Sequence, residues 1–321
     1  MTRVLGIDVG GSGSRVAIRL TGAEAGDEFA ADGIGVTTGG STAPARVLAL
    51  LRCAAQQWPD EIREVAAIGV GTTGMGTLVP QPGELAEELT NELRRLTGRL
   101  DVGAAVAIDA VTAHLGALGG RPGAVIALGT GAIAIGGDGR ERWHRVDGWG
   151  HLLGDRGAGA WIGIRGLEAA MRAYDQVDDS GTALLETAKR RFGEPLTWPS
   201  QFYTRHDRAG VLAGFAADVA QLAAAGDPSA DAIMALAGQV AARSVVAALQ
   251  LSPEPVIAAT GGIFRAGGTL EAQFLSTVAM LRPDAKVRAP AGNPLDGALL
   301  LAHRVAAGEK QTHVPFVWVN R

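Results

Sequence analysis

The stretch that decides the fold is Gly6-Ile7-Asp8-Val9-Gly10-Gly11-Ser12-Gly13-Ser14. It starts inside a short apolar run, residues 4–9, and ends in a glycine-rich turn. A second strand-like run, residues 15–20, follows the turn directly. The pattern therefore predicts a hairpin whose first strand carries an aspartate, Asp8, just before the turn.

The same pattern recurs about half a chain later. Residues 124–128 are apolar, Gly129-Thr130-Gly131 forms the turn, and residues 132–135 are apolar again. Two such units suggest two lobes of related architecture, although two ordinary hairpins would give the same pattern.

Strand-like and helix-like segments alternate around these two hairpins, as in α/β lobes. We expect an N-terminal lobe of residues 1–115 and a C-terminal lobe of residues 116–294. A last helix at about 295–310 is expected to pack back on the first lobe. The expected helices lie at 45–57, 84–96, 166–174, 212–225, 231–251 and 295–307, and the further strands at 65–70, 104–108 and 256–259.

The composition points to small-molecule ligands. With 47% hydrophobic residues and a net charge of −4, the chain of 321 residues gives no electrostatic reason to expect nucleic acid or an anionic membrane surface as a partner. Its single cysteine, Cys53, excludes an intrachain disulfide and a multi-cysteine metal cluster. No signal peptide and no long uncharged apolar run is evident, so we expect a cytoplasmic protein.

Asp8 has two interpretations, because an unpaired carboxylate at the end of an apolar strand is costly to bury. In the first, the turn glycines let phosphate oxygens approach the backbone, and Asp8 binds Mg²⁺ directly or through its water shell. In the second, Asp8 accepts hydrogen bonds from the tight turn after it. The residues alone leave both open.

Gly129-Thr130-Gly131 is a candidate second phosphate loop, with a plain hairpin turn as the alternative. The pair of loops indicates phosphate binding more strongly than either loop alone. Neither loop has the Walker pattern ending in Gly-Lys-Ser or Gly-Lys-Thr, and neither has the spacing of a dinucleotide fingerprint followed by a helix. Those two nucleotide-binding folds are therefore disfavoured.

Asp109 follows the uncharged strand 104–108, and ligands gather beyond the carboxyl ends of strands in open α/β sheets. A carboxylate placed there suits the general base that phosphoryl transfer to a hydroxyl requires. The alternative is that Asp109 caps the helix that starts at Ala110, and one carboxylate can do both.

The most distinctive stretch spans residues 148–159, where the glycine spacing suits neither helix nor strand and predicts an ordered loop. Trp149 offers an apolar face for a sugar, and Asp155 can accept hydrogen bonds from paired hydroxyls. Alternatively, Trp149 and Trp161 are core anchors and Asp155 is a turn residue. His114 and His151 lack the spacing of metal ligands, so we expect ordinary polar packing.

These segments together resemble the BadF/BadG/BcrA/BcrD ATPase family, and within it the N-acetylglucosamine and glucosamine kinase branch. The resemblance covers nearly the whole chain. It implies an α/β, two-lobed actin-like (ribonuclease H-like) ATPase fold with the nucleotide in the cleft between the lobes. Its motifs resemble the opening stretch 6–14, the turn 128–131, the blocks 148–150, 153–155 and 161–163, and the adenosine-side segment Thr260-Gly261-Gly262-Ile263.

The resemblance also implies roles for single residues. ATP and Mg²⁺ are the expected cofactors, with Asp8 holding the metal and Asp109, in Ile108-Asp109-Ala110, acting as the base for the sugar hydroxyl. The nucleotide is expected to contact Gly10, Gly11, Ser12, Gly13, Ser14, Arg15, Gly129, Thr130, Gly131, Gly261 and Gly262, and the sugar to contact Asp109, Thr130, Gly148, Trp149 and Asp155.

The implied reaction is transfer of the ATP γ-phosphoryl group to a hydroxyl, with O6 expected, of N-acetylglucosamine or glucosamine. A small sugar is the expected partner, with neither nucleic acid nor membrane, and a homodimer is a candidate assembly. Three positions depart from the family pattern. Ile108 replaces the usual Asn, Arg156 stands where Glu is frequent, and Ser41-Thr42-Ala43 occupies a place where relatives present Asn to the sugar.

Two other functions fit the same fold. Family members that activate iron–sulfur enzymes need several thiolates at a dimer interface, and Cys53 is the only thiol here. The related ROK sugar kinases usually carry a cysteine-rich zinc motif that this chain cannot supply. A non-catalytic sugar or nucleotide sensor is the alternative from another class, and the presence of both Asp8 and Asp109 argues against it.

Overall fold

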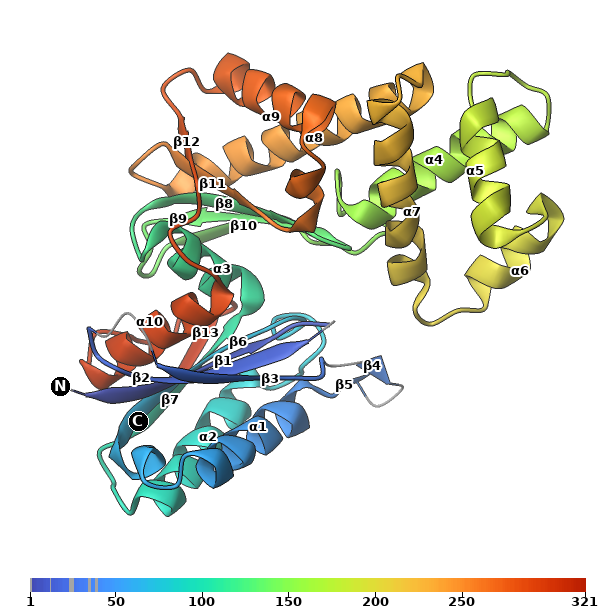
Figure 1. Ribbon diagram of the computed structural model, residues 1–321. Helices are drawn as coiled ribbons and strands as arrows, with labels where there is room; N and C mark the ends of the chain where they lie inside the picture. Colours follow the sequence, from blue (N-terminus) through green and yellow to red (C-terminus); the bar gives the residue numbers. More distant parts are fainter. Residues whose placement is uncertain (1, 12, 23–25, 34–35, 38–39) are drawn as a thin grey trace. The chain divides into compact units, whose positions relative to one another are not determined.

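The computed structural model describes residues 2–11, 13–22, 26–33, 36–37 and 40–321. The described chain divides into two compact units. Unit 1 comprises Met1–Pro122, Gly137–Trp143 and Ala289–Arg321, and unit 2 comprises Gly123–Gly136 and His144–Arg288. Each unit contains one mixed sheet with helices, as the sequence predicted for a two-lobed actin-like fold (Figure 1).

The sheet of unit 1 has six strands in the order β13-β7-β6-β1-β2-β3. The opening stretch forms the predicted hairpin of β1 and antiparallel β2, and β1, β6 and β7 run parallel. These three central strands are almost entirely buried, as expected for parallel strands covered on both faces. Their bounds are β1 (Arg3–Val9), β2 (Ser14–Leu20), β3 (Asp27–Ala31), β6 (Val65–Thr72), β7 (Gly103–Ile108) and β13 (Val317–Asn320), and β4 (Val36–Thr37) with β5 (Gly40–Ser41) forms a separate two-stranded sheet.

Helices cover both faces of this sheet (Figure 1). The predicted helices appear as α1 (Ala43–Gln57) and α2 (Pro82–Thr97) on one face, and α3 (Asp109–Leu118) and α10 (Pro294–Ala306) lie on the other. Helix α10 begins with a capping box of Asn293 and Asp296, and it packs against α3, β6 and β1. The short 3₁₀ helix η1 (Glu61–Glu64) leads into β6.

The sheet of unit 2 has five strands in the order β10-β9-β8-β11-β12, with β8, β11 and β12 parallel. The second glycine turn connects β8 to β9, as the repeated pattern predicted. The strands are β8 (Gly123–Leu128), β9 (Ala132–Gly137), β10 (Trp143–Asp147), β11 (Val256–Thr260) and β12 (Lys286–Arg288).

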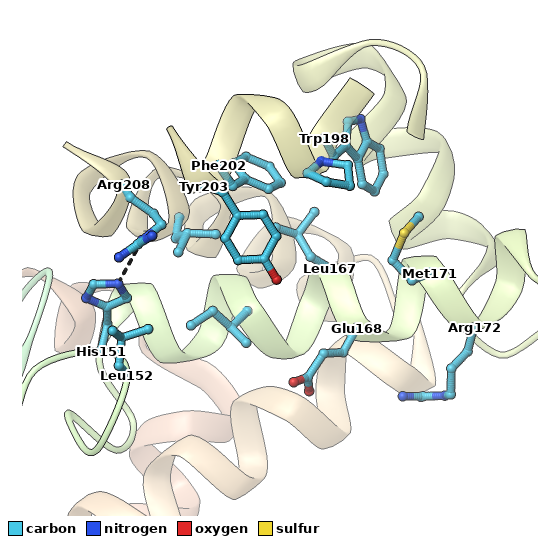
Figure 2. Close-up of a pocket in the computed structure, with 13 residues that line it drawn as sticks. His151, Leu152, Leu167, Glu168, Met171, Arg172, Trp198, Phe202, Tyr203 and Arg208 are labelled. Carbon is cyan, nitrogen blue, oxygen red and sulfur yellow. Dashed lines mark hydrogen bonds between the residues drawn. The ribbon is translucent and has the colours of Figure 1, made fainter. Parts of the chain in front are cut away.

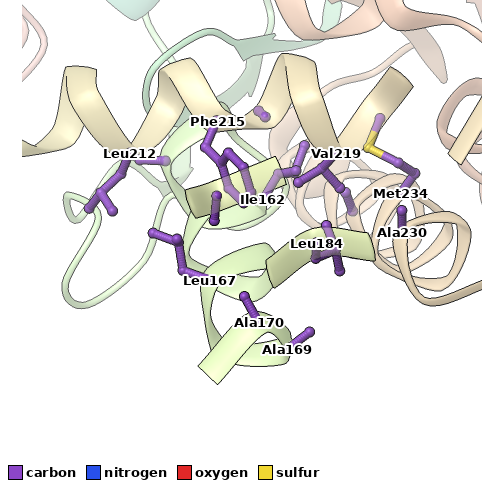
Figure 3. Close-up of a cluster of buried hydrophobic side chains, with 14 of the residues drawn as sticks. Ile162, Leu167, Ala169, Ala170, Leu184, Leu212, Phe215, Val219, Ala230 and Met234 are labelled. Carbon is purple, nitrogen blue, oxygen red and sulfur yellow. The ribbon is translucent and has the colours of Figure 1, made fainter. Parts of the chain in front are cut away.

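The helices of unit 2 bury two apolar clusters. One lies between the sheet and α8 and α9, and the other lies among α4, α5, α7 and α8, where Phe215 and Leu184 are fully buried (Figure 3). The helices are α4 (Gly159–Tyr174), α5 (Thr182–Phe192), α6 (Trp198–Tyr203), α7 (Arg208–Ala224), α8 (Pro228–Ala248) and α9 (Gly268–Leu281), with 3₁₀ segments η2 (Pro195–Thr197), η3 (Leu249–Leu251) and η4 (Gly262–Ala266).

The segment Pro228–Leu251, which includes α8, is long and apolar enough to cross a membrane by length and composition. Half of its most apolar stretch of 18 residues is nevertheless buried inside the protein, where α8 packs against α9, α7 and β8. It also carries Asp231 and Arg243. These contacts are those of a core helix.

The expected lobe boundary at residue 115 falls inside α3, which ends at Leu118. The structural division comes later, at Pro122, because α3 packs along its length on α10 and contacts β6 and β7. As a division of functional lobes, residues 1–115 and 116–294 stay a prediction.

Candidate functional site

Asp8 lies near the carboxyl end of β1, between two strands. In the register of the sheet it is opposite Arg15 on β2 and Gly71 on β6. Arg15 donates a hydrogen bond from Nη2 to Asp8 Oδ2 over 3.1 Å. Burial raises the pKa of the Asp8 carboxyl, although the Arg15 hydrogen bond and charge oppose that shift. A buried carboxylate of this kind is stabilised by a further cation beside it.

The turn after Asp8 is closed by a hydrogen bond of 2.9 Å from the Gly10 amide to the Gly13 carbonyl. Ser14, an expected nucleotide contact, is 2% exposed, and its hydroxyl donates to the Asp32 carbonyl over 2.8 Å. Its side chain therefore holds the hairpin to the following segment. Ser12, also expected to contact the nucleotide, lies outside the described residues, and Gly11 is exposed.

Three neighbouring parallel strands, β1, β6 and β7, end at the same edge of the sheet. Val9 is paired with Thr72, and Thr72 with Ile108, so the residues after these positions share that edge. Between Asp8 and Asp109 lies Gly71-Thr72-Thr73-Gly74, which the sequence analysis did not single out. The Thr73 amide donates to the Val9 carbonyl over 3.1 Å, which ties this segment to the first glycine turn.

Asp109 is the first residue of α3 and follows Ile108, the last residue of β7. Its Oδ1 accepts a hydrogen bond of 2.8 Å from the Ala110 amide, and its carbonyl accepts one of 3.0 Å from the Thr112 hydroxyl. The carboxylate is half-buried. Asp109 is therefore inside α3, whose N-cap position is Ile108, and its side chain makes no N-cap bond. The bond from the Ala110 amide holds the carboxylate at the strand edge.

In unit 2 the second glycine turn contacts the start of α4. The Gly159 and Ala160 amides donate to the Gly129 and Thr130 carbonyls over 2.9 and 3.1 Å. Gly129 and Thr130 are exposed, whereas Gly131 is partly covered. The backbone of this turn is thereby held in place while Thr130 is exposed. Phosphate binding at this turn stays a prediction.

The predicted adenosine-side segment lies on the neighbouring strand. Thr260 of β11 is paired with Ala127 of β8 in parallel, so both motifs follow the carboxyl ends of adjacent strands. Gly261 has a φ of 101°, and a Cβ there would collide with the Leu128 carbonyl. Gly261 and Gly262 are exposed. The structure thus brings Gly129-Thr130-Gly131 and Gly261-Gly262 to one edge of the unit 2 sheet.

The loop 148–159 is organised around Asp147, a residue that the sequence analysis missed. Asp147 is 5% exposed and has a φ of 64°. Its Oδ1 accepts a hydrogen bond of 2.7 Å from the Asp155 amide, and its Oδ2 accepts one of 2.9 Å from the Arg156 amide. Arg156 Nη1 also lies 3.6 Å from Asp147 Oδ2. Arg156, the departure from the family pattern, therefore pairs with the residue that holds the loop.

Asp155, an expected sugar ligand, is 8% exposed and lies inside this loop. Its Oδ1 accepts a hydrogen bond of 3.1 Å from the Gly150 amide, and a Cβ on Gly131 would reach within 2.5 Å of its Oδ2. Burial, together with the nearby charge of Asp147, raises the pKa of the Asp155 carboxyl. In this structure Asp155 joins the loop to the second glycine turn, and a direct contact with sugar stays a prediction.

Trp149 is one of the exposed side chains of the loop, with 62% of its surface accessible. The guanidinium of Arg145 lies 4.5 Å from the centre of its ring, and Arg145 also donates to the Asp147 and Gly148 carbonyls, each over 3.0 Å. The alternative of a core anchor is therefore excluded for Trp149. Its indole stands at the surface of unit 2, where an apolar face is available to a ligand.

The two histidines that were set aside as metal ligands have ordinary packing partners. His114 is fully buried with its ring edge-on to Trp143, and His151 accepts a hydrogen bond of 3.2 Å from Arg208. Within the described part of the chain no group of three or more His, Cys, Asp or Glu side chains is placed to hold a metal ion.

Comparison with known proteins identifies relatives. The chain is 32% identical over 117 residues to the N-acetylmuramic acid/N-acetylglucosamine kinase of Clostridium acetobutylicum, which is 36% of each chain. It is 32% identical over 206 residues to the N-acetyl-D-glucosamine kinase of Dictyostelium discoideum, which is 60% of this chain and 63% of that one. The match thus spans about a third of the Clostridium acetobutylicum protein and under two thirds of the Dictyostelium discoideum protein.

A solved structure agrees over nearly the whole length. A proposed N-acetylglucosamine kinase of Chromobacterium violaceum superposes with a TM-score of 0.67 and 26% identity, over 94% of this chain and 99% of the other. The model of the BadF/BadG/BcrA/BcrD ATPase family matches residues 5–302. This match includes both glycine turns, Asp109, the 148–159 loop and Gly261-Gly262, and the chain therefore belongs to the BadF/BadG/BcrA/BcrD ATPase family.

Proposed function

We propose that this protein is an ATP-dependent sugar kinase whose acceptor is an amino sugar, N-acetylglucosamine or glucosamine. The observation that carries the proposal is the position of Asp8 and Asp109 at one edge of the unit 1 sheet, beyond neighbouring parallel strands. The two curated relatives and the Chromobacterium violaceum protein, each named for N-acetylglucosamine kinase activity, support the acceptor class.

In the proposed reaction Asp109 is the general base. A sugar hydroxyl, with O6 expected, attacks the γ-phosphorus of ATP. The bond from that phosphorus to the β–γ bridging oxygen breaks, and ADP leaves. Asp109 accepts the hydroxyl proton, for which its carboxylate must be ionised and held within hydrogen-bonding distance of the acceptor oxygen. The 2.8 Å bond from the Ala110 amide to Oδ1 fixes the orientation of the carboxylate.

The nucleotide is assigned to backbone-rich segments. We assign the phosphates to the turn 10–15 and to Gly129-Thr130-Gly131, and the adenosine to Gly261-Gly262. Exposed glycines let a ligand approach the main chain closely, and Thr130 adds a hydroxyl donor. Ser14 contributes through its backbone alone in this scheme, because its hydroxyl is bonded to Asp32.

The residues present fit magnesium bound in the manner usual for phosphotransferases. Mg²⁺ commonly takes one or two carboxylates, phosphate oxygens and water instead of a cage made only of protein ligands. Asp8 supplies such a carboxylate, and its burial leaves a cost that a neighbouring cation reduces. Bound there, the ion would neutralise charge on the phosphates, and Asp8 would hold it directly or through water.

The sugar is assigned to Asp109, Thr130, Gly148 and Trp149, with Asp155 as the residue that shapes the pocket or binds a hydroxyl. Trp149 offers an exposed apolar face against which a pyranose ring can pack. At the position where relatives present Asn, the Ser41 hydroxyl accepts a bond of 3.2 Å from the Ala43 amide at the start of α1, which leaves its O–H free to donate to a sugar oxygen.

A coupled assay with ATP, Mg²⁺ and a panel of sugars tests the proposal. The panel contains N-acetylglucosamine, glucosamine, N-acetylmuramic acid, glucose and mannose, and it is ranked by kcat/KM. We expect sugar-dependent ADP release with an amino sugar at the head of the ranking, and one sugar phosphate formed for each ADP. If no sugar stimulates ADP release above the background, the kinase proposal fails and a non-catalytic sensor becomes the better account.

A further inference from the structure

A large apolar pocket lies in the helical part of unit 2, and none of its lining residues has a role in the proposed kinase reaction. Its volume is about 620 Å³, within the range of roughly 300–1,000 Å³ that small-molecule sites occupy. Helices α4, α6 and α7 supply most of its wall, and the 148–159 loop closes one end (Figure 2). Its aromatic lining consists of Trp198, Phe202 and Tyr203.

The aromatic side chains differ in how firmly they are held. Trp198 is 2% exposed, and its indole Nε1 donates to the Gly193 carbonyl over 2.9 Å, so it forms a fixed part of the wall. Tyr203 is 79% exposed, and its ring lies over the pocket in Figure 2. Leu152, at the loop end, is 72% exposed. Apolar side chains so exposed around a pocket indicate a surface suited to an apolar ligand.

The charged side chains around the pocket differ in whether they have an oppositely charged partner. Arg172 is paired with Asp178 over 2.9 Å, and Glu168 is paired with Arg165 over 2.6 Å. Arg208, at the end next to the loop, donates a hydrogen bond of 3.2 Å to His151. In the part of the chain that the structure describes, no Asp or Glu lies within 4.0 Å of the Arg208 guanidinium nitrogens.

Two neighbours explain why Arg208 keeps its charge uncompensated. The adjacent carboxylate, Asp207, is taken by Arg205 through bonds of 2.7 and 2.6 Å. His151 accepts from Arg208 through Nε2, which must therefore be unprotonated. Burial, followed by the charge of Arg208, lowers the pKa of the His151 imidazole. The imidazole therefore stays neutral and does not offset the positive charge of Arg208. A half-buried guanidinium of this kind is suited to an anionic partner.

We propose that this pocket binds a small apolar carboxylic acid, with its carboxylate on Arg208 and its apolar body against Trp198 and Phe202. The volume limits the ligand to a small molecule, the lining selects an apolar body, and Arg208 selects a negative head. His151 and Leu152 belong to the same loop as Trp149, so an occupant packs directly against the loop that we assign to the sugar.

The test is a displacement experiment with the intact protein, without ATP or sugar, so that its outcome does not depend on kinase activity. The fluorescent probe 8-anilinonaphthalene-1-sulfonate reports occupancy, and octanoate and octan-1-ol compete for it. The two competitors share chain length and differ in charge. We expect octanoate to displace the probe at a concentration about tenfold lower than octanol, the value of one charge-assisted hydrogen-bonded pair.

Two variants locate the site. Arg208→Gln is expected to reduce the preference for octanoate to below about threefold. Leu152→Glu places a carboxylate at the exposed rim and is expected to weaken octanoate about fivefold or more by like-charge repulsion. Arg282→Gln, on an arginine that is paired with Asp284 and does not line the pocket, is the matched control and is expected to behave as the wild type. Circular dichroism verifies the fold of each variant. If Arg208→Gln does not fold, the result with Leu152→Glu decides the test.

Equal competition by octanoate and octanol in the wild type would overturn the proposal, as would unchanged octanoate binding in both Arg208→Gln and Leu152→Glu. Size-exclusion chromatography tests whether a second copy of this chain occupies the pocket instead. A dimer whose formation excludes the probe as protein concentration rises would show that a second copy fills the pocket, and would also overturn the proposal.

Discussion

The two glycine turns of this protein are flanked by aspartates that differ in their exposure and in their hydrogen-bond partners. Beside the first turn, Asp8 and Asp109 lie at strand ends, partly exposed, with Arg15 and a helix amide as neighbours. Beside the second turn, Asp147 and Asp155 are nearly inaccessible and accept main-chain amides. Aspartates in similar glycine-rich surroundings thus divide into candidates for chemistry and residues that shape a loop.

This difference decides what a substitution should measure. Removing a carboxylate that faces a substrate lowers turnover and leaves the fold intact, because little of the native structure depends on it. Removing one that accepts main-chain amides inside a loop, as Asp147 does with two, lowers the free energy of unfolding, and activity falls only through the loss of folded protein.

The largest effect is expected for Asp109→Asn. The asparagine oxygen can still accept the Ala110 amide, so this contact at the start of α3 is kept, while the base is gone. We expect kcat to fall by about 10²–10⁴, with a melting temperature near that of the wild type. The exposed Asp101, paired with Arg99 on the surface, provides the matched control. Asp101→Asn is expected to retain full turnover, and an equal fall in both variants would contradict the assignment.

Asp147→Ala should have the next largest effect, on stability. The substitution leaves the Asp155 and Arg156 amides without their charged acceptor in a buried loop. Two hydrogen bonds to a charged group make this loss about 3 kcal/mol, measurable by urea denaturation. A variant as stable as the wild type would show that the loop does not depend on Asp147, and would weaken the contrast between the two turns.

Lys310→Met tests a buried charge in unit 1 that has no part in the proposed chemistry. Lys310 is 3% exposed and donates to the Arg140 carbonyl, and burial lowers its pKa to about 8. Its unfolded-state pKa is higher, so the unfolded state binds more protons between pH 8 and about 10.5. Wild-type stability should therefore rise relative to Lys310→Met across that window, on the order of 3 kcal/mol in total.

The measurement is the difference in unfolding free energy between wild type and Lys310→Met at several pH values from 7 to 10.5. Lys286→Met, which removes an exposed lysine, serves as the control and should show no such trend. A constant difference across the window would mean that Lys310 is not desolvated as its burial indicates. Sugar-dependent turnover at pH 7 should be unchanged in the folded variant.

Trp149→Ala should give the smallest effect. The indole is exposed and its one described cation partner is Arg145, so the stability cost should stay below about 1 kcal/mol. Loss of an apolar face for the sugar is expected to raise KM roughly 3–10-fold with kcat little changed. Steady-state kinetics at saturating ATP measure this, and an unchanged KM would remove Trp149 from the sugar site.

The sequence predicted the parts of the candidate site that local patterns define. The alternation of apolar strands and glycine turns was sufficient to locate both hairpins and to place Asp8 and Asp109 at strand ends. The position of Ser14 was also accessible in principle, because it shares a face of β2 with buried Val16 and Ile18.

Other features depend on contacts that no local pattern defines. Asp147 acts on amides eight and nine residues later, and its φ of 64° follows from the folded loop. Asp155 was predicted as a sugar ligand because a carboxylate can accept bonds from paired hydroxyls, and its packing against the Gly131 turn could not be seen from the sequence. Its contact with sugar stays a prediction. Gly71-Thr72-Thr73-Gly74 gains significance only from the pairing of β6 with both β1 and β7.

The most direct test of the central claim is the affinity of Asp109→Asn for the best sugar of the panel, measured by isothermal titration calorimetry beside the wild type. If Asp109 is the base, the variant should bind sugar within about threefold of the wild-type Kd while its turnover is nearly lost. A Kd that weakens in proportion to turnover, or turnover close to that of the wild type, would contradict the assignment of Asp109 as the catalytic base.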